Sequence, residues 1–148
     1  MGAEEIVFFN CDRCVVRLDP KKGADKKVER WQRIAEEAAK QSGRGIIPTV
    51  RYIDSFREML REAAESQLKL FMYETGDRIS MQQAIRSALP CTTAAVICGP
   101  EGGFTAEEAE LARSEGFAVC AMGPRILRCE TAPLIPLTAI LYETANLD

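Results

Sequence analysis

Two glycine-rich turns, each directly after a short apolar run, constrain the fold of this chain more than any other feature. The first, residues 99–105, has the sequence GPEGGFT and follows the run 94–98; the second begins at Gly123 and follows the run 117–122. A strand that ends in glycines and turns into a helix brings bare backbone N–H groups close to a ligand. Two such strand ends meet at the carboxyl edge of a parallel sheet. We therefore predict a pocket for a nucleotide-like cofactor at this edge.

The rest of the chain alternates between apolar runs and helical patterns. Thr105 and Glu108 have the spacing of a capping box at a helix start. A long apolar helix is expected after Thr131, with Pro136 past its first turn, where proline costs a hydrogen bond or kinks the helix. Short apolar runs lie at 6–9 and 15–18. Helices are predicted at 27–41 (ended by Gly43), after a cap at Ser55, and at 79–89, and strands are predicted at 50–53 and 68–73. The alternation predicts an α/β fold with a mainly parallel sheet flanked by helices.

Composition favours one globular domain over residues 1–148. The chain is 47% hydrophobic, no apolar run reaches membrane-spanning length, and no secretory leader pattern occurs at its start. Six cysteines without regular spacing favour reduced thiols and a cytoplasmic location.

Cys11 and Cys14 form a C-x-x-C pair. Because no histidine or second pair completes a zinc site, packing is favoured over metal binding, and no metal is expected.

Charge is polarised along the chain, although the net charge is only −3. Residues 17–51 contain ten basic and five acidic residues, whereas residues 52–124 are net acidic. The basic segment is a candidate for contacts with a phosphate backbone, through Lys21, Lys22, Lys26, Lys27, Arg30, Arg33 and Arg44. The alternative is an ordinary solvated helix face.

The two turns, together with an upstream block, resemble the RsmE family of SPOUT-superfamily RNA methyltransferases. The matching blocks are G-P-E-G-G from Gly99, G-P-R-I-L-R-C-E-T-A from Gly123, and Q-S-G-R from Gln41, followed by Ile47 and Pro48. The resemblance covers about residues 7–141. It implies an α/β knot with a deep trefoil topology, S-adenosylmethionine as cofactor, methylation of N3 of a uridine in 16S ribosomal RNA of the 30S subunit, and a homodimer built on the last helix. The family also carries a PUA-like RNA-binding barrel and a first strand and helix, which this chain is expected to lack.

The cofactor is expected to bind between the turns, with its adenine against residues 122–127. The predicted cofactor-binding residues are Tyr73, Gly99, Pro100, Glu101, Gly102, Gly103, Met122, Gly123, Ile126, Leu127, Arg128, Thr131 and Ala132. Uridine N3 bears a proton, and without histidine the candidate proton acceptors are Glu101 and Glu130. Arg125 and Arg128 are the candidate cations for charge on the uracil oxygens.

Each of these residues also has a structural explanation. The alternative role of Glu101 is to cap the N-terminus of the following helix, where the helix dipole favours a carboxylate. The alternative role of Arg125 and Arg128 is an ion pair with Glu130. Two other functions stay open at this point. One is a non-catalytic SPOUT remnant that dimerises or binds RNA; the other is a phosphate-binding module, although no P-loop sequence occurs and Glu101 would repel phosphate.

Overall fold

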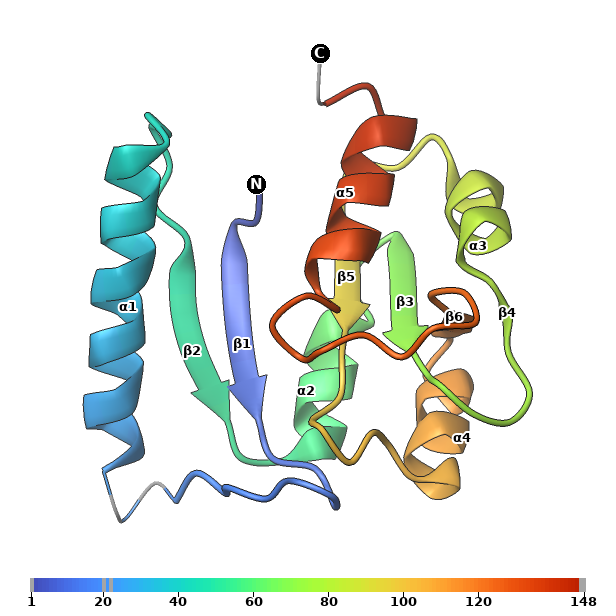
Figure 1. The fold of residues 1–148 in the computed structure, drawn as a ribbon, viewed down its shortest axis with the longest axis horizontal. Coiled ribbons are helices and arrows are strands. Elements are labelled where there is room, and N and C mark those ends of the chain that lie inside the picture. The colour runs from blue at the N-terminus through green and yellow to red at the C-terminus, as the bar shows by residue number, and fades with distance from the viewer. Residues whose placement is uncertain (1, 20, 22, 147–148) are drawn as a thin grey trace. The chain divides into compact units, whose positions relative to one another are not determined.

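The computed structural model describes residues 2–19, 21 and 23–146. The chain divides into two compact units (Figure 1). The first comprises Met1–Asn10 and Val16–Met59, and the second comprises Cys11–Val15 and Leu60–Asp148. The helix α2 (Phe56–Ala63) contains residues of both units. One domain over residues 1–148 stays a prediction.

The first unit is a parallel pair of strands covered by one long helix. β1 (Glu5–Phe9) pairs in parallel with β2 (Thr49–Ile53), and α1 (Ala24–Gln41) packs on β2. The rings of Phe8 and Trp31 stack with their centroids 3.9 Å apart. The predicted helix at 27–41 is confirmed, and it begins three residues earlier than the periodicity indicated.

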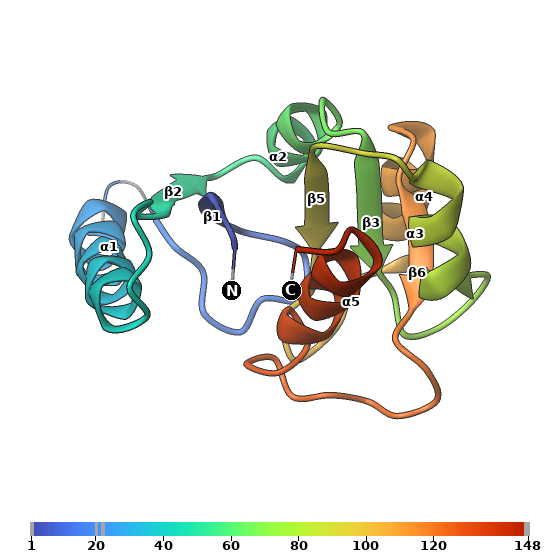
Figure 2. The ribbon, with the colours of Figure 1, turned by 90° about the horizontal axis from the view of Figure 1, so that it is seen from above.

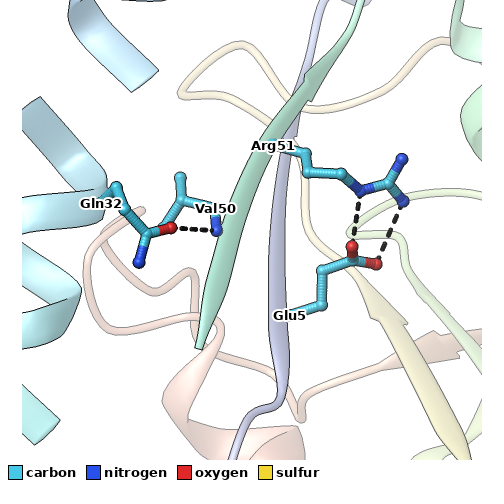
Figure 3. Close-up of polar contacts among 4 residues, drawn as sticks. All are labelled: Glu5, Gln32, Val50 and Arg51. Carbon is cyan, nitrogen blue, oxygen red and sulfur yellow. Dashed lines mark hydrogen bonds and ion pairs between the residues drawn. The ribbon is translucent and has the colours of Figure 1, made fainter. Parts of the chain in front are cut away.

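Polar contacts fix this unit on both sides of β2 (Figure 3). The amide of Gln32 accepts from Val50 N at 2.8 Å and donates to the carbonyl of Pro48 at 3.1 Å, so α1 satisfies backbone groups of the strand next to it. Across the strand pair, Arg51 donates from Nη2 to Glu5 Oε2 at 3.1 Å.

The second unit contains a four-stranded parallel sheet with the strand order β4-β6-β3-β5. In chain order its elements are β3 (Leu68–Met72), β4 (Ile79–Ser80), α3 (Met81–Ala88), β5 (Ala94–Ile97), α4 (Ala106–Ser114), β6 (Ala118–Ala121) and α5 (Leu134–Glu143). The α/β class with a mainly parallel sheet is confirmed. The trefoil knot stays a prediction.

The central strand β3 is buried on both faces, as a parallel strand should be. Leu68, Leu70 and Met72 pack in one core cluster with Ile85 of α3 and Ile140 of α5. Figures 1 and 2 show α3 and α5 side by side, in agreement with their contacts. On the other face, Phe71 packs against Phe104, with ring centroids 4.2 Å apart.

Two local expectations differ from the structure. The helix expected at 79–89 begins only at Met81, because Ile79 and Ser80 pair with β6. The helix expected after Thr131 begins only at Leu134, because successive turns occupy the intervening residues.

Pro136 therefore lies in the first turn of α5 and not past it. Backbone N–H groups in a first turn have no partner within the helix, so proline loses no hydrogen bond there. The prediction of a lost bond at Pro136 was wrong for this reason, and its buried ring adds to the core.

No helix among the described residues is both long and apolar enough to cross a bilayer.

Candidate functional site

A pocket lies at the carboxyl edge of the sheet in the second unit. Because β3 lies between β5 and β6, the turns that follow these two strands flank the end of β3. Side chains and backbone from all three strand ends line the pocket. They are Met72, Glu74, Cys98, Gly99, Pro100, Glu101, Gly103, Phe104, Met122, Ile126, Leu127, Cys129 and Ala132.

Most of the predicted cofactor-binding residues lie in this lining, from both glycine turns. They are Gly99, Pro100, Glu101, Gly103, Met122, Ile126, Leu127 and Ala132. The other predicted cofactor-binding residues lie outside the lining: Tyr73, Gly102, Gly123, Arg128 and Thr131. Tyr73 is buried and donates its N–H to the carbonyl of Cys120 at 2.9 Å, which extends the pairing of β3 with β6.

The first glycine turn is shaped by close packing. Gly103 has φ +65 and donates its N–H to the carbonyl of Pro100 at 2.8 Å, which closes the turn. A Cβ at Gly99 would lie 3.1 Å from the Phe104 ring, so glycine lets this ring pack under the turn. A Cβ at Gly103 would have only Glu74 Oε2 nearby, at 3.7 Å. Residue 103 therefore needs glycine for its backbone conformation.

The helix that follows the turn starts with the predicted capping box. Thr105 accepts from Glu108 N at 3.1 Å, and Glu108 Oε2 accepts from Thr105 N at 2.8 Å. Glu107, in the same first turn, accepts a backbone hydrogen bond and one from Thr105, and both lower the pKa of its carboxyl group.

The charges around the pocket are acidic. Glu74 and Glu101 line it, and the described lining residues include no lysine or arginine. Burial first, and then the charges of Glu101, Glu130 and Glu74, raise the pKa of the Cys129 thiol. Burial, and to a smaller extent Cys129, raises the pKa of the Cys98 thiol to about 12. A pocket of this kind favours a cationic ligand over a phosphate.

The candidate catalytic residues are divided between the pocket and its surroundings. Glu101 lines the pocket, whereas Arg125 and Arg128 are exposed and lie outside the lining. The Arg128 side chain is 87% exposed, and its Nη1 lies 3.9 Å from Oε1 of the exposed Glu130. The Arg128 carbonyl accepts from the N–H groups of Thr131 and Ala132, so the backbone here is held while the guanidinium group lies exposed.

The candidate RNA-binding residues lie in the first unit. Lys26, Lys27, Arg30 and Arg33 are exposed on α1, and Lys21 is exposed before it. Arg44 is half-buried and donates to the carbonyl of Ala3 at 2.9 Å. Lys22 lies outside the described residues.

Five lining residues are not among the residues predicted from the sequence, namely Met72, Glu74, Cys98, Phe104 and Cys129. Glu74 had a usable signal, because it follows the buried strand β3, whose carboxyl end belongs to the same edge as the two glycine turns. The two cysteines had none, since cysteine also occurs as an ordinary small core residue. No three His, Cys, Asp or Glu side chains come together as metal ligands in the part of the chain that the structure describes.

Comparison with known proteins gives a consistent set of relatives. Residues 1–141 match the family model described as an RNA methyltransferase domain. Ribosomal RNA small subunit methyltransferase E of Bacillus subtilis is 43% identical over 148 residues, which cover 97% of this chain and 57% of that protein. The chain spans about half the length of the curated relatives it matches.

Solved structures agree with the sequence relatives. A crystal structure titled only as that of a hypothetical protein aligns with a TM-score of 0.85 and 42% identity, over 99% of this chain and 58% of that one. A ribosomal RNA small subunit methyltransferase E from Neisseria gonorrhoeae, bound to S-adenosyl methionine, aligns with a TM-score of 0.75 and 35% identity, over 91% of this chain and 53% of that one.

Proposed function

The chain belongs to the RNA methyltransferase domain family, and on this premise we propose that it methylates small-subunit ribosomal RNA with S-adenosylmethionine. The observation that carries the proposal is the acidic pocket between the two glycine turns at the carboxyl edge of the sheet. The relative from Neisseria gonorrhoeae, whose fold aligns with this chain, holds the same cofactor. We propose N3 of a uridine in 16S ribosomal RNA as the target, as the RsmE resemblance implies, and the cytoplasm as the location.

The residues of the pocket suit the chemistry of this cofactor. S-adenosylmethionine supplies an electrophilic methyl group on a positively charged sulfur, and it carries an ammonium group as well. Glu74 and Glu101 provide negative charge for these cationic groups. Ile126 and Leu127 provide apolar walls for the adenine, and the turn at 99–103 brings backbone close to it. A phosphate-binding module is less well supported, because the same carboxylates repel phosphate.

The protein's task in methyl transfer is to orient the uridine and to manage one proton. The new bond joins N3 to the methyl carbon while the bond from that carbon to sulfur breaks, so the N3 proton must leave. Glu101 lines the pocket and is the proposed proton acceptor. Arg128 directly follows the lining residue Leu127, and its exposed guanidinium group is proposed to hold the uracil or its phosphate, with assistance from Arg125. Glu130 is a second candidate for the proton.

Two further surfaces support association with partners. The helix α5 leaves Leu134, Ile135 and Tyr142 exposed, and we propose that a second copy of the chain covers this apolar surface. The basic face of α1 is proposed to contact RNA phosphates, which supply the sequence-independent part of affinity.

Calorimetric titration tests the cofactor assignment. We expect the chain to bind S-adenosylmethionine and S-adenosylhomocysteine and not ATP. Gly103→Val should abolish binding while the circular dichroism spectrum is kept, because it strains a residue at φ +65 and adds methyl groups beside Glu74. Gly45→Ala, where no atom lies within 4 Å of a new Cβ, is the matched control. Binding of ATP alone would overturn the assignment.

Transfer of a tritiated methyl group to 30S subunits tests the reaction. Arg128→Ala should remove transfer and leave cofactor affinity nearly unchanged, whereas Arg57→Ala, an exposed arginine of α2, should change neither. Cofactor binding without any transfer by the parent chain would favour the non-catalytic alternative.

A further inference from the structure

A short segment far from the glycine turns in sequence, residues 11–15, belongs to the second unit and contacts the first glycine turn. Asp12 donates its backbone N–H to Glu108 Oε1 at 2.8 Å. The other oxygen of the same carboxylate, Oε2, accepts from Thr105 N at 2.8 Å. Glu108 is only 6% exposed, so one buried carboxylate joins segment 11–15 to the start of α4.

Arg13 adds two hydrogen bonds to the turn itself. Its Nη1 donates to the carbonyl of Gly102 at 3.1 Å and to the carbonyl of Phe104 at 3.2 Å. Gly103, which lines the pocket, lies between these two carbonyls in sequence. The guanidinium group is charged at every physiological pH, and a charged donor makes a stronger hydrogen bond than a neutral one.

The approach of Arg13 also explains why residue 102 is glycine. A Cβ at Gly102 would lie 2.9 Å from Arg13 Cβ and 3.1 Å from the Arg13 carbonyl oxygen. The first of these distances is shorter than real Cβ contacts, so any side chain would push segment 11–15 away. Gly102 lies outside the pocket lining, and its missing side chain makes room for Arg13.

We propose that Arg13 is a positioning residue for the cofactor turn, a role that rests on the proposed function. By holding the carbonyls on both sides of Gly103, Arg13 keeps residues 99–103 in the conformation that receives the cofactor. Without these bonds, the turn samples other conformations. The apparent affinity for the cofactor then falls in proportion to the fraction of time that the turn spends in the binding conformation. The cofactor need not touch Arg13 for this effect.

Cofactor titration of Arg13→Met tests the proposal against Arg61→Met, which removes an exposed charge from α2. We expect about tenfold weaker binding of S-adenosylhomocysteine for Arg13→Met, from the loss of two hydrogen bonds to a charged donor. The Arg61 variant should bind like the parent. Arg13→Lys keeps a charged donor and should recover part of the loss, which a purely steric role of the side chain would not produce. Parent-like affinity of Arg13→Met would overturn the proposal.

A double-mutant cycle separates positioning from general destabilisation. Gly102→Ala displaces the same segment, so its effect on affinity and that of Arg13→Met should be clearly less than additive. Fully additive losses would mean that the two residues act independently and would contradict the proposal. If Arg13→Met fails to fold, the pair Gly102→Ala and Arg13→Lys supplies the same cycle.

Hydrogen exchange of the ligand-free chain makes the test independent of the proposed function. Amides in residues 99–105 should exchange faster in Arg13→Met than in the parent, and those of α1 should not change. Unchanged exchange in the turn would overturn the positioning role even if the parent binds the cofactor. If the parent binds no S-adenosylhomocysteine while Arg13→Met still exchanges faster in the turn, the proposed function fails and the role of Arg13 in the turn stands.

Discussion

Replacement of Glu108 should destabilise the second unit by an amount that depends on how many acceptor oxygens the new side chain keeps. The two carboxylate oxygens accept from two different backbone N–H groups, those of Asp12 and Thr105, each at 2.8 Å. Glu108→Gln keeps one acceptor and turns an NH₂ group toward the other N–H, so one of the two bonds must be lost. Glu108→Ala removes both acceptors and the capping box with them.

The magnitudes follow from the number of bonds. A hydrogen bond to a charged group contributes about 1.5–3 kcal/mol to the free energy of unfolding. Asp12 is exposed, so water replaces part of its bond, and Glu108→Gln should cost about 2 kcal/mol. Glu108→Ala should cost roughly 3–5 kcal/mol, because both N–H groups lose their partner. For a chain of this length, the glutamine variant should lower Tm by roughly 4–8 °C.

Urea unfolding followed by circular dichroism measures both variants, with Glu110→Gln as the control. Glu110 is an exposed glutamate of the same helix, and its ion pair with Arg113 lies at the surface, so its replacement keeps the segment contact and should change stability little. The reasoning would be refuted if Glu108→Gln were as stable as the parent. It would also be refuted if Glu108→Gln cost as much as Glu108→Ala, because the second acceptor would then contribute nothing.

Four other outcomes are expected. Burial raises the pKa of the Cys98 thiol to about 12 and that of Cys120 to about 11, so at pH 8 mass spectrometry should find both alkylated by iodoacetamide far more slowly than in urea; equal rates would contradict this burial. The unfolded chain loses these two thiol protons at a lower pH than the folded chain does, so the free energy of unfolding should fall as the pH rises above about 9. A urea midpoint that rises above this pH would have the wrong sign. Light scattering should give about twice 16.4 kDa for the parent and 16.4 kDa for Ile135→Glu, and a monomeric parent would count against the dimer. Replacing Lys26 and Arg30 by glutamine should lower the salt slope of RNA binding by roughly two, whereas an unchanged slope would make this an ordinary solvated helix face.

Most elements of the fold could be predicted because their signals are local. Thr105 and Glu108 are three residues apart, and a capping box needs nothing beyond that spacing. The start of α5 could not be predicted in this way, because backbone turns rather than a side-chain cap fix where the helix begins, and Pro133 occupies the position before it.

The candidate site could be predicted only for residues that follow the two strands before the glycine turns. Gly99, Glu101 and Gly103 line the pocket as expected, since they follow a single strand. The contacts of Arg13 with this turn join residues 89 and 91 positions apart, and no local pattern reports such a pair. The C-x-x-C spacing of Cys11 and Cys14 indicates a role for the thiols, whereas it is Arg13, between them, that donates to the carbonyls of the turn.

An NMR titration of the ¹⁵N-labelled chain with S-adenosylhomocysteine shows whether the pocket between the two glycine turns holds the cofactor. We expect saturable shifts at one equivalent for the amides of Gly99, Gly103 and Leu127, with none for the amides of α1. Absence of any shift, or shifts confined to residues outside the two turns, would contradict it.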